Sequence, residues 1–213
     1  MQTDLTPSLW RTCRVLANTR RLCLLRSVCG DGGGCVSDLA QRTGLPEEKA
    51  SQHLRLLQSR GLLRAVRTGP RVLYLARADP LVRHAVPLLA ALRDAVRAEV
   101  ADDLLRQLTA FTHPRRQVLV RCLADRPGDV DELAMRSGIS RPALFRHLRK
   151  LVCRGFVGCT QEGAYVLLRP DSIFGRCLLQ IALETRVSHL RRCETVTRAG
   201  TNNRRRRVRA NGV

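Results

Sequence analysis

Residues 38–63 read DLAQRTGLPEEKASQHLRLLQSRGLL, and residues 132–157 read ELAMRSGISRPALFRHLRKLVCRGFV. Placed over each other without a gap, they share about ten identical residues, which include the pairs Leu39/Leu133, Gly44/Gly138, His53/His147 and Gly61/Gly155. Each copy has the pattern of a helix, a tight turn at glycine, a second helix and a terminating glycine. This is the layout of a helix-turn-helix, and its repetition predicts a duplicated domain.

The composition favours helices over sheets. The 213 residues are 44% hydrophobic but only 3% aromatic. The core therefore has to be built from Leu, Val and Ala, which suit helices better than aromatic-rich sheets. This length allows one or two domains, and two copies of a small domain fill it.

The chain is strongly basic. It has 38 Lys and Arg residues against 18 Asp and Glu, a net charge of +20, and Lys49 and Lys150 are its only lysines. Guanidinium groups match phosphates and base edges, so a pI near 11.3 predicts a polyanionic partner. The alternative is that a GC-rich coding sequence supplies arginine at every basic position without any defined site.

The N-terminal residues and the cysteines bear on location. MQTDLTPSLWR lacks the basic stretch and long apolar run of a secretory signal, and no apolar run approaches the ~20 residues of a membrane span. We expect a cytoplasmic protein with no membrane partner. Nine cysteines are an odd number, which favours reduced thiols over a disulfide framework.

Three helices are expected in the first part of the chain. Two of them precede Gly30, and the pair Asn18-Thr19 can cap the second. The third begins at a cap formed by Ser37 or Asp38 and ends at Gly44. The glycine-rich run at residues 30–34 lacks the Lys-Ser/Thr of a phosphate loop, so we interpret it as a turn.

A fourth helix and a hairpin complete the first copy. The helix has Pro46 in its first turn and runs to about Arg60. Its apolar stripe is Ala50, Leu54 and Leu57. Its outward positions, which can enter a DNA major groove, are Glu48, Lys49, Ser51, Gln52 and Arg55. The sequence LLRAVRTGPRVLYLA then reads as two strands joined by a basic tip from Arg67 to Arg71, which is a wing.

The second copy repeats this plan. A helix opens at His113 and runs through Leu123, the next spans residues 130–136, and the reading helix spans residues 141–154. The hairpin FVGCTQEGAYVLL places Glu162 where the first wing has arginine. The second wing is therefore expected to bind phosphate more weakly than the first.

Two apolar stripes follow the hairpins. The first predicts one long linking helix and consists of Leu88, Leu92, Val96, Val100, Leu104 and Leu108. The second consists of Ile173, Cys177, Leu178 and Ile181, behind the possible cap Asp171-Ser172. We infer that the two stripes pack together and arrange the copies as an intra-chain pseudo-dimer.

The expected fold class is mainly α with small β-hairpin wings, in tandem winged helix-turn-helix domains. The expected divisions are 1–79 (first winged helix-turn-helix domain), 80–109 (linking long helix), 110–170 (second winged helix-turn-helix domain), 171–198 (C-terminal packing helix) and 199–213 (basic disordered tail). Short charge runs such as this tail are usually disordered.

One family resemblance is specific enough to state. Residues 10–80 resemble the ArsR (arsenic-repressor-like) winged-helix regulators through NTRRL at 18–22, SDLAQRTGLPEEKASQHLRLL and the wing sequence RTGPRVLY, while residues 110–170 resemble them more loosely. In that family a homodimer reads a palindromic operator, and metal ions or other signals release it. The resemblance implies double-stranded DNA as the partner. Two heads in one chain resemble a fused dimer, and further homodimerisation is left open.

The resemblance also implies positions at or near DNA. In the first reading helix and wing these are Glu47, Lys49, Ser51, Gln52, His53, Arg67 and Arg71. In the second reading helix they are Arg141, Ala143, Phe145, Arg146 and His147. The candidate DNA-binding residues are therefore Lys49, Ser51, Gln52, His53, Arg55, Arg67, Arg71, Ser140, Arg141, Arg146, His147 and Arg149. Since the two sets differ, the two half-sites should differ, and Arg141 and Arg146 are the best candidates for guanine.

No metal and no cofactor are expected. The metal-responsive relatives carry Cys-Val-Cys-Asp-Leu before the turn, whereas this chain has Cys35-Val36-Ser37-Asp38-Leu39 and so lacks the second thiolate. A thiol switch or site formed by Cys29 and Cys35, joined by Cys13 or Cys23, is left open. The default for Cys23, Cys122, Cys153 and Cys177 is a buried apolar role. For His53 and His147 we favour support of the helix or contact with phosphate over metal binding.

The sequence predicts a regulator rather than an enzyme. It contains no nucleophile elbow, no Walker loop and no zinc-hydrolase helix. We expect a sequence-specific transcription regulator, a repressor that reads two non-identical half-sites. The alternative is a winged-helix module for general nucleic-acid binding or protein interaction, because a fold does not fix a function.

Overall fold

The computed structural model describes residues 7–98 and 101–184 and is mainly helical with two small hairpins. The helices are α1 (Leu9–Leu16), α2 (Thr19–Gly30), α3 (Val36–Thr43), α4 (Glu47–Gln58), α5 (Ala85–Ala98), α6 (Ala101–Ala110), α7 (Pro114–Asp125), α8 (Val130–Ser137), α9 (Arg141–Val152) and α10 (Ile173–Glu184). The strands are β1 (Arg64–Thr68), β2 (Arg71–Leu75), β3 (Val157–Cys159) and β4 (Tyr165–Leu167). The expected basic tail at 199–213 and residues 185–198 of the expected C-terminal helix lie outside the described residues.

The ends of the first helices follow from local hydrogen bonds. The Asn18 side chain accepts a bond from the Arg21 amide at 3.1 Å, which confirms the expected cap of α2. The cap of α3 was expected at Ser37 or Asp38 and is instead Cys35. The amide of Cys35 donates to the Asp38 carboxylate at 3.3 Å, so this aspartate closes the helix start from inside the first turn.

The turn between α3 and α4 has the geometry that the glycine predicts. Gly44 has φ +64°, a left-handed conformation that glycine adopts without strain. Pro46 was expected inside the first turn of α4, but it lies just before the helix as its cap. Its extended ψ of 140° explains this position, because the helix begins only at the next residue.

The first unit consists of α1 to α5 with the β1–β2 hairpin, and the second unit of α6 to α10 with the β3–β4 hairpin; their helix-turn-helix pairs, α3 with α4 and α8 with α9, both bury apolar helix faces. The expected stripe of α4, Ala50, Leu54 and Leu57, is completely buried. In α9 the buried residues are Ala143, Leu144, Leu148 and Leu151. Each hairpin is tied to the loop before its helix-turn-helix by an isolated bridge, which joins Tyr74 to Gly34 in the first unit and Tyr165 to Gly128 in the second.

The prediction of a single long linking helix is wrong. The structure has two helices there, α5 and α6, and Val100 of the expected stripe lies outside the described residues. The stripe serves two different partners, which explains the division. Leu88, Leu92 and Val96 are buried on α5, which packs against α10 and α2, whereas Leu104 and Leu108 are buried on α6, which packs against α1.

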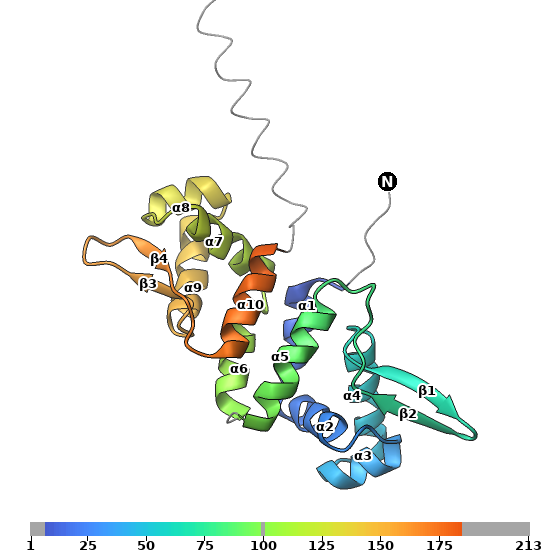
Figure 1. Cartoon of the computed structure of the whole chain (residues 1–213). Coiled ribbons are helices and arrows are strands. Elements are labelled where there is room, and N and C mark those ends of the chain that lie inside the picture. The colour runs from blue at the N-terminus through green and yellow to red at the C-terminus, as the bar shows by residue number, and fades with distance from the viewer. Residues whose placement is uncertain (1–6, 99–100, 185–213) are drawn as a thin grey trace, which may run out of the picture.

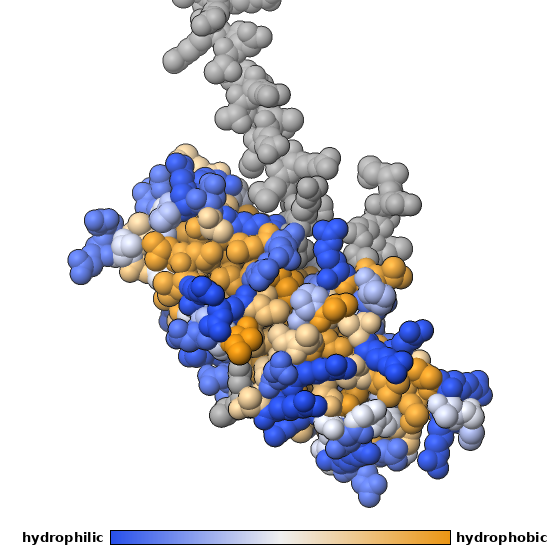
Figure 2. Space-filling view, in the orientation of Figure 1, coloured by the Kyte–Doolittle hydropathy of each residue, from blue (hydrophilic) through white to orange (hydrophobic). Residues whose placement is uncertain are grey.

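Helices α5 and α10 pack against each other, as predicted, but Ile173 of the second stripe is 72% exposed because it is the first residue of α10. They lie side by side in the middle of the molecule, and the two hairpins project at opposite ends (Figure 1). Hydrophilic side chains cover the tips of both hairpins, and apolar side chains gather between them (Figure 2). Within residues 7–98 and 101–184, no helix is long and apolar enough to span a bilayer.

Candidate nucleic-acid interface

Helix α9 presents arginines on its outward face. Its inner positions fill the core, and the side chains of Arg141, Arg146 and Arg149 are exposed on the opposite side, with Ser140 exposed just before the helix. Ala143, which the family resemblance placed at or near DNA, is only 4% exposed and belongs to the core. Every third or fourth residue of this helix has to face inward, so this side chain packs in the core, and its place at or near DNA stays a prediction.

Arg141 has a partner within its own unit. Its guanidinium forms an ion pair with the carboxylate of Asp131, which lies in the first turn of α8. Both side chains are exposed, so this pair adds little to stability. It does hold the guanidinium at the N-terminal end of α9, where side chains of a reading helix reach base edges.

A basic cleft of about 560 Å³ lies between α9 and the start of α7. Among the residues that the structure describes, six arginines and lysines line it and no carboxylate does. The lining residues are His113, Arg115, Arg116, Ala143, Arg146, His147, Arg149, Lys150, Cys153 and Arg154. Cations gathered without an acidic neighbour repel one another, so an anion such as phosphate is favoured here.

Arg116 supports the floor of the basic cleft. It is only 3% exposed, and it donates to the carbonyls of Ala110 and Thr109 and to the hydroxyl of Thr112. Burial, and then the neighbouring Arg154, lower the pKa of the Arg116 guanidinium to about 10. It therefore remains charged at neutral pH.

Two histidine rings lie together in the basic cleft. The ring centres of His113 and His147 are 4.5 Å apart. Burial, then the His113 ring and the surrounding cations, lower the pKa of His147 to about 4, so its imidazole is neutral at pH 7. His113 also caps α7, because its Nδ1 accepts the Arg115 amide at 3.2 Å. His147 therefore lies among cationic side chains and contacts the start of α7 through the His113 ring.

His53 occupies the equivalent place in the first unit. It is half-buried, and burial followed by the charges of Arg21, Arg20 and Lys49 lowers its pKa. Among residues 7–98 and 101–184 its buried Nδ1 finds no hydrogen-bond partner. Asn18 stands where the second unit has His113, so the ring pair of the second unit has no counterpart here.

Helix α4 offers a more neutral outward face than α9. Lys49, Gln52 and Arg55 are exposed, and Ser51 is half-buried. The Gln52 amide donates to the Glu48 carboxylate at 3.0 Å, and the Arg55 guanidinium donates to the Ser51 hydroxyl at 2.9 Å. Three of the expected reading residues, Ser51, Gln52 and Arg55, are thus already hydrogen-bonded to neighbours on the same helix.

The two wings carry different charges. Arg67 and Arg71 are exposed at the tip of the β1–β2 hairpin, where Thr68 pairs with Arg71. In the turn between β3 and β4, the exposed Glu162 takes the place of a cation. The weaker binding of phosphate expected of the second wing stays a prediction.

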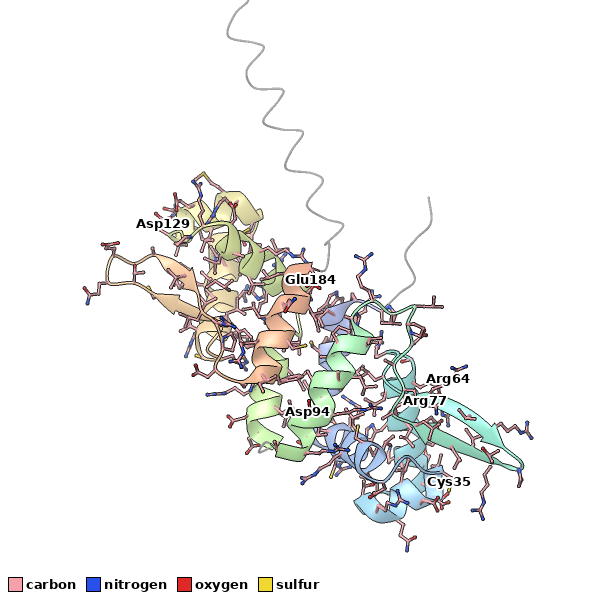
Figure 3. The ribbon with its side chains drawn as sticks, viewed as in Figure 1. Cys35, Arg64, Arg77, Asp94, Asp129 and Glu184 are labelled. Carbon is pink, nitrogen blue, oxygen red and sulfur yellow. The ribbon has the colours of Figure 1, made fainter. Side chains whose placement is uncertain are left out.

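Several basic residues of this surface were missing from the sequence prediction. Arg64 and Arg77, at the two ends of the first hairpin, lie near each other at its base (Figure 3). Both line a groove of about 420 Å³. Arg115, Arg116, Lys150 and Arg154 of the basic cleft were missed as well. An interpretation of one helix at a time could not find them, because the cleft lies between α9 and the start of α7, which are not consecutive helices.

The cysteines do not gather with other ligands. In the part of the chain that the structure describes, no three His, Cys, Asp or Glu side chains form a group able to hold a metal ion. The Cys35 sulfur lies 3.0 Å from the Ser37 hydroxyl. Cys23 and Cys153, for which a buried apolar role was expected, are exposed, because they fall on outward faces of α2 and at the end of α9.

One family model matches the chain. It is that of the MarR family, and it covers residues 111–161, which hold α7, α8, α9, β3 and the turn of the second wing. No curated protein and no solved structure matches. The match supports a winged helix-turn-helix domain of a DNA-binding transcription regulator, a class that is not enzymatic. The ArsR-like character of residues 10–80 stays a prediction.

Proposed function

We propose that this chain is a sequence-specific, double-stranded DNA-binding transcription regulator that carries two reading heads. It acts as a repressor, because a protein that occupies an operator blocks polymerase. The single observation that carries the proposal is the outward face of α9, where exposed arginines stand within the segment that matches a family of DNA-binding regulators.

Contacts within the second unit support the assignment of roles. Arg141 and Arg146 read bases, since their guanidiniums can make paired bonds to guanine. The basic cleft holds backbone phosphate beside them, and Arg115, Arg149 and Lys150 supply the cations there. Phosphate contacts fix the register of the protein on the duplex, and base contacts set the sequence that is preferred.

The tandem arrangement supports two half-sites. The order of helices and strands from α2 to β2 recurs from α7 to β4, with an isolated bridge from hairpin to loop in each. Because α5 packs against α10 and α6 against α1, the two units meet through equivalent helices, as in a twofold dimer. The hairpins at opposite ends (Figure 1) agree with heads that reach two successive major-groove faces, about one turn or ~10 bp apart.

The two half-sites differ in this proposal. Ser51 and Gln52 stand in the first reading helix where Phe145 and Arg146 stand in the second. Glu47 at the start of α4 repels phosphate, whereas Arg141 occupies the equivalent position of α9. The first head therefore relies on Lys49 and its basic wing, and the second on the arginines of α9 and the basic cleft.

Selection of duplex DNA tests the proposal. The full chain is mixed with a random duplex library at about physiological salt, and the enriched duplex is titrated against its scrambled form. Two unlike half-sites at about one-turn spacing are expected. Equal affinity for the enriched and scrambled duplexes contradicts sequence-specific reading and favours an architectural or protein-binding role.

Two substitutions sharpen the test. Arg141→Ala and Arg146→Ala should each cost about 1–3 kcal/mol at a single base position and relax the preference there. Arg115→Ala, on the phosphate side, should weaken binding to all duplexes equally. A uniform loss with all three variants is the result expected of a general nucleic-acid-binding module.

A further inference from the structure

Phe145 is an exposed aromatic side chain on the outward face of α9. The chain has four phenylalanines, and Phe111, Phe156 and Phe174 are at most 1% exposed. Phe145 is 52% exposed. A single exposed apolar residue is ordinary on a protein surface. What distinguishes Phe145 is its position among the residues that face DNA in the proposed function.

The neighbours of Phe145 are arginines. Arg141 lies one helical turn before it and Arg149 one turn after it, so the three side chains share a face of the helix. Arg146 is adjacent and exposed. Guanidiniums select hydrogen-bond acceptors on base edges, whereas a phenyl ring neither donates nor accepts such a bond. Its preferred contact is therefore an apolar group on the floor of the groove.

The major groove exposes one methyl group, the C5-methyl of thymine. We propose that Phe145 is a specificity-determining residue that contacts this methyl in the half-site read by the second unit. The inference rests on the proposed function, because it requires α9 in the major groove. The equivalent position of the first unit is Ser51, whose hydroxyl can bond to either base, so no methyl requirement is expected in the first half-site.

Replacement of thymine by uracil isolates this contact. Uracil keeps the pairing edge and every hydrogen-bonding group of thymine and lacks only the methyl. In the duplex enriched by the full chain, each thymine is replaced in turn, and affinity is measured at fixed salt. One position in the half-site of the second unit is expected to lose about fourfold in affinity, the value of one buried methyl-sized group.

Variants at Phe145 assign the loss to this side chain. In Phe145→Ala the thymine and uracil duplexes should bind equally at that position, while Phe145→Leu should keep most of the difference because leucine is also apolar. Val152→Ala is the matched control. It removes another exposed apolar side chain of α9, at the last residue of the helix, and should leave the fourfold difference unchanged. Since Phe145 is outside the core, circular dichroism should show that all three variants are folded.

The outcomes separate the two proposals. A preferred duplex in which no thymine-to-uracil change matters, or in which the difference survives in Phe145→Ala, overturns the role of Phe145 and leaves the regulator intact. If selection yields no preferred duplex, the proposed function fails and the role of Phe145 fails with it.

Discussion

Thr12 Oγ1 lies 2.9 Å from His84 Nε2, and both side chains are buried. The bond joins α1 to the residue just before α5. The second unit has a similar pair, in which the Ser172 hydroxyl donates to Gln107 Oε1 at 2.6 Å and joins α6 to the residue before α10. Only the first pair contains a titratable group, the imidazole of His84.

Burial of His84 makes stability depend on pH. Desolvation lowers the pKa of His84 from 6.5 to about 4. Below pH 6.5 His84 becomes protonated in the unfolded chain but stays neutral in the folded chain. The free energy of unfolding therefore falls as the pH drops from 6.5 to about 4. The stability that depends on neutral His84 is fully present above pH 6.5, and its loss at low pH lowers the free energy of unfolding by at most about 3 kcal/mol.

Urea unfolding at pH 7 and pH 4.5 measures this effect. His84→Gln, which keeps a polar group near Thr12 but does not titrate, should show a smaller loss of stability on acidification than the wild type. His53, His113 and His147, whose pKa values are also lowered, are present in both proteins and form the common background. Equal losses in the two proteins would contradict the assignment to His84.

Two equivalent glycines should respond differently to alanine. Gly61 and Gly155 lie three residues after the ends of α4 and α9, with φ +72° and +75°. A Cβ at Gly61 would lie 2.9 Å from Val82 Cγ2, whereas a Cβ at Gly155 meets nothing within 4 Å. Both alanine variants carry the left-handed strain of about 1–2 kcal/mol, and Gly61→Ala adds the clash. Thermal unfolding should therefore show a larger drop in Tm for Gly61→Ala.

Arg116 should not tolerate lysine. Its guanidinium bonds to three oxygens in the floor of the basic cleft, and a single ammonium on a longer stem cannot satisfy all of them. We expect Arg116→Lys to lower the free energy of unfolding by about 1–3 kcal/mol. Arg115→Lys, at the exposed neighbouring position, is the control and should be nearly neutral in the same denaturant titration.

The first wing should carry part of the salt dependence of DNA binding. Each phosphate contact contributes about 0.9 to the slope of log affinity against log salt concentration. Arg67→Ala combined with Arg71→Ala should lower that slope by up to about 2. The substitution Gln161→Ala in the second wing removes no charge and should leave the slope unchanged, which titrations at three salt concentrations can establish.

Much of the local structure was predictable from the sequence. The turn at Gly44, the helix cap at Asn18 and the buried face of α4 are local features. Each depends on residues a few positions apart, so the sequence was enough to predict them. The errors have the same origin. Cys35 is the N-cap of α3 because the Asp38 carboxylate accepts a hydrogen bond from its amide. Ser37 and Asp38 were predicted as caps because both are residue types that commonly cap helices. The apolar residues from Leu88 to Leu108 are evenly spaced and so predicted one helix. They belong to two helices because α5 packs against α10 and α2, whereas α6 packs against α1.

The candidate site was predictable as a set of outward positions, although Ser51, His53 and His147 are half-buried and Ala143 is buried. The arginines of α9 follow from helical periodicity. The basic cleft does not, since it depends on how closely the start of α7 approaches α9. The pairing of Arg141 with Asp131 also depends on the angle between α8 and α9, which no spacing along the chain encodes.

Because α5 and α10 belong to one polypeptide, their association does not obey the mass-action law that governs two separate subunits. A dimer that dissociates on dilution loses its second head, and its operator occupancy then falls with the square of the protein concentration. Here the second head remains tethered at any dilution, so under the proposed function occupancy follows the first power of concentration. A cell could therefore regulate such an operator with few copies of the protein and with a graded rather than a steep response.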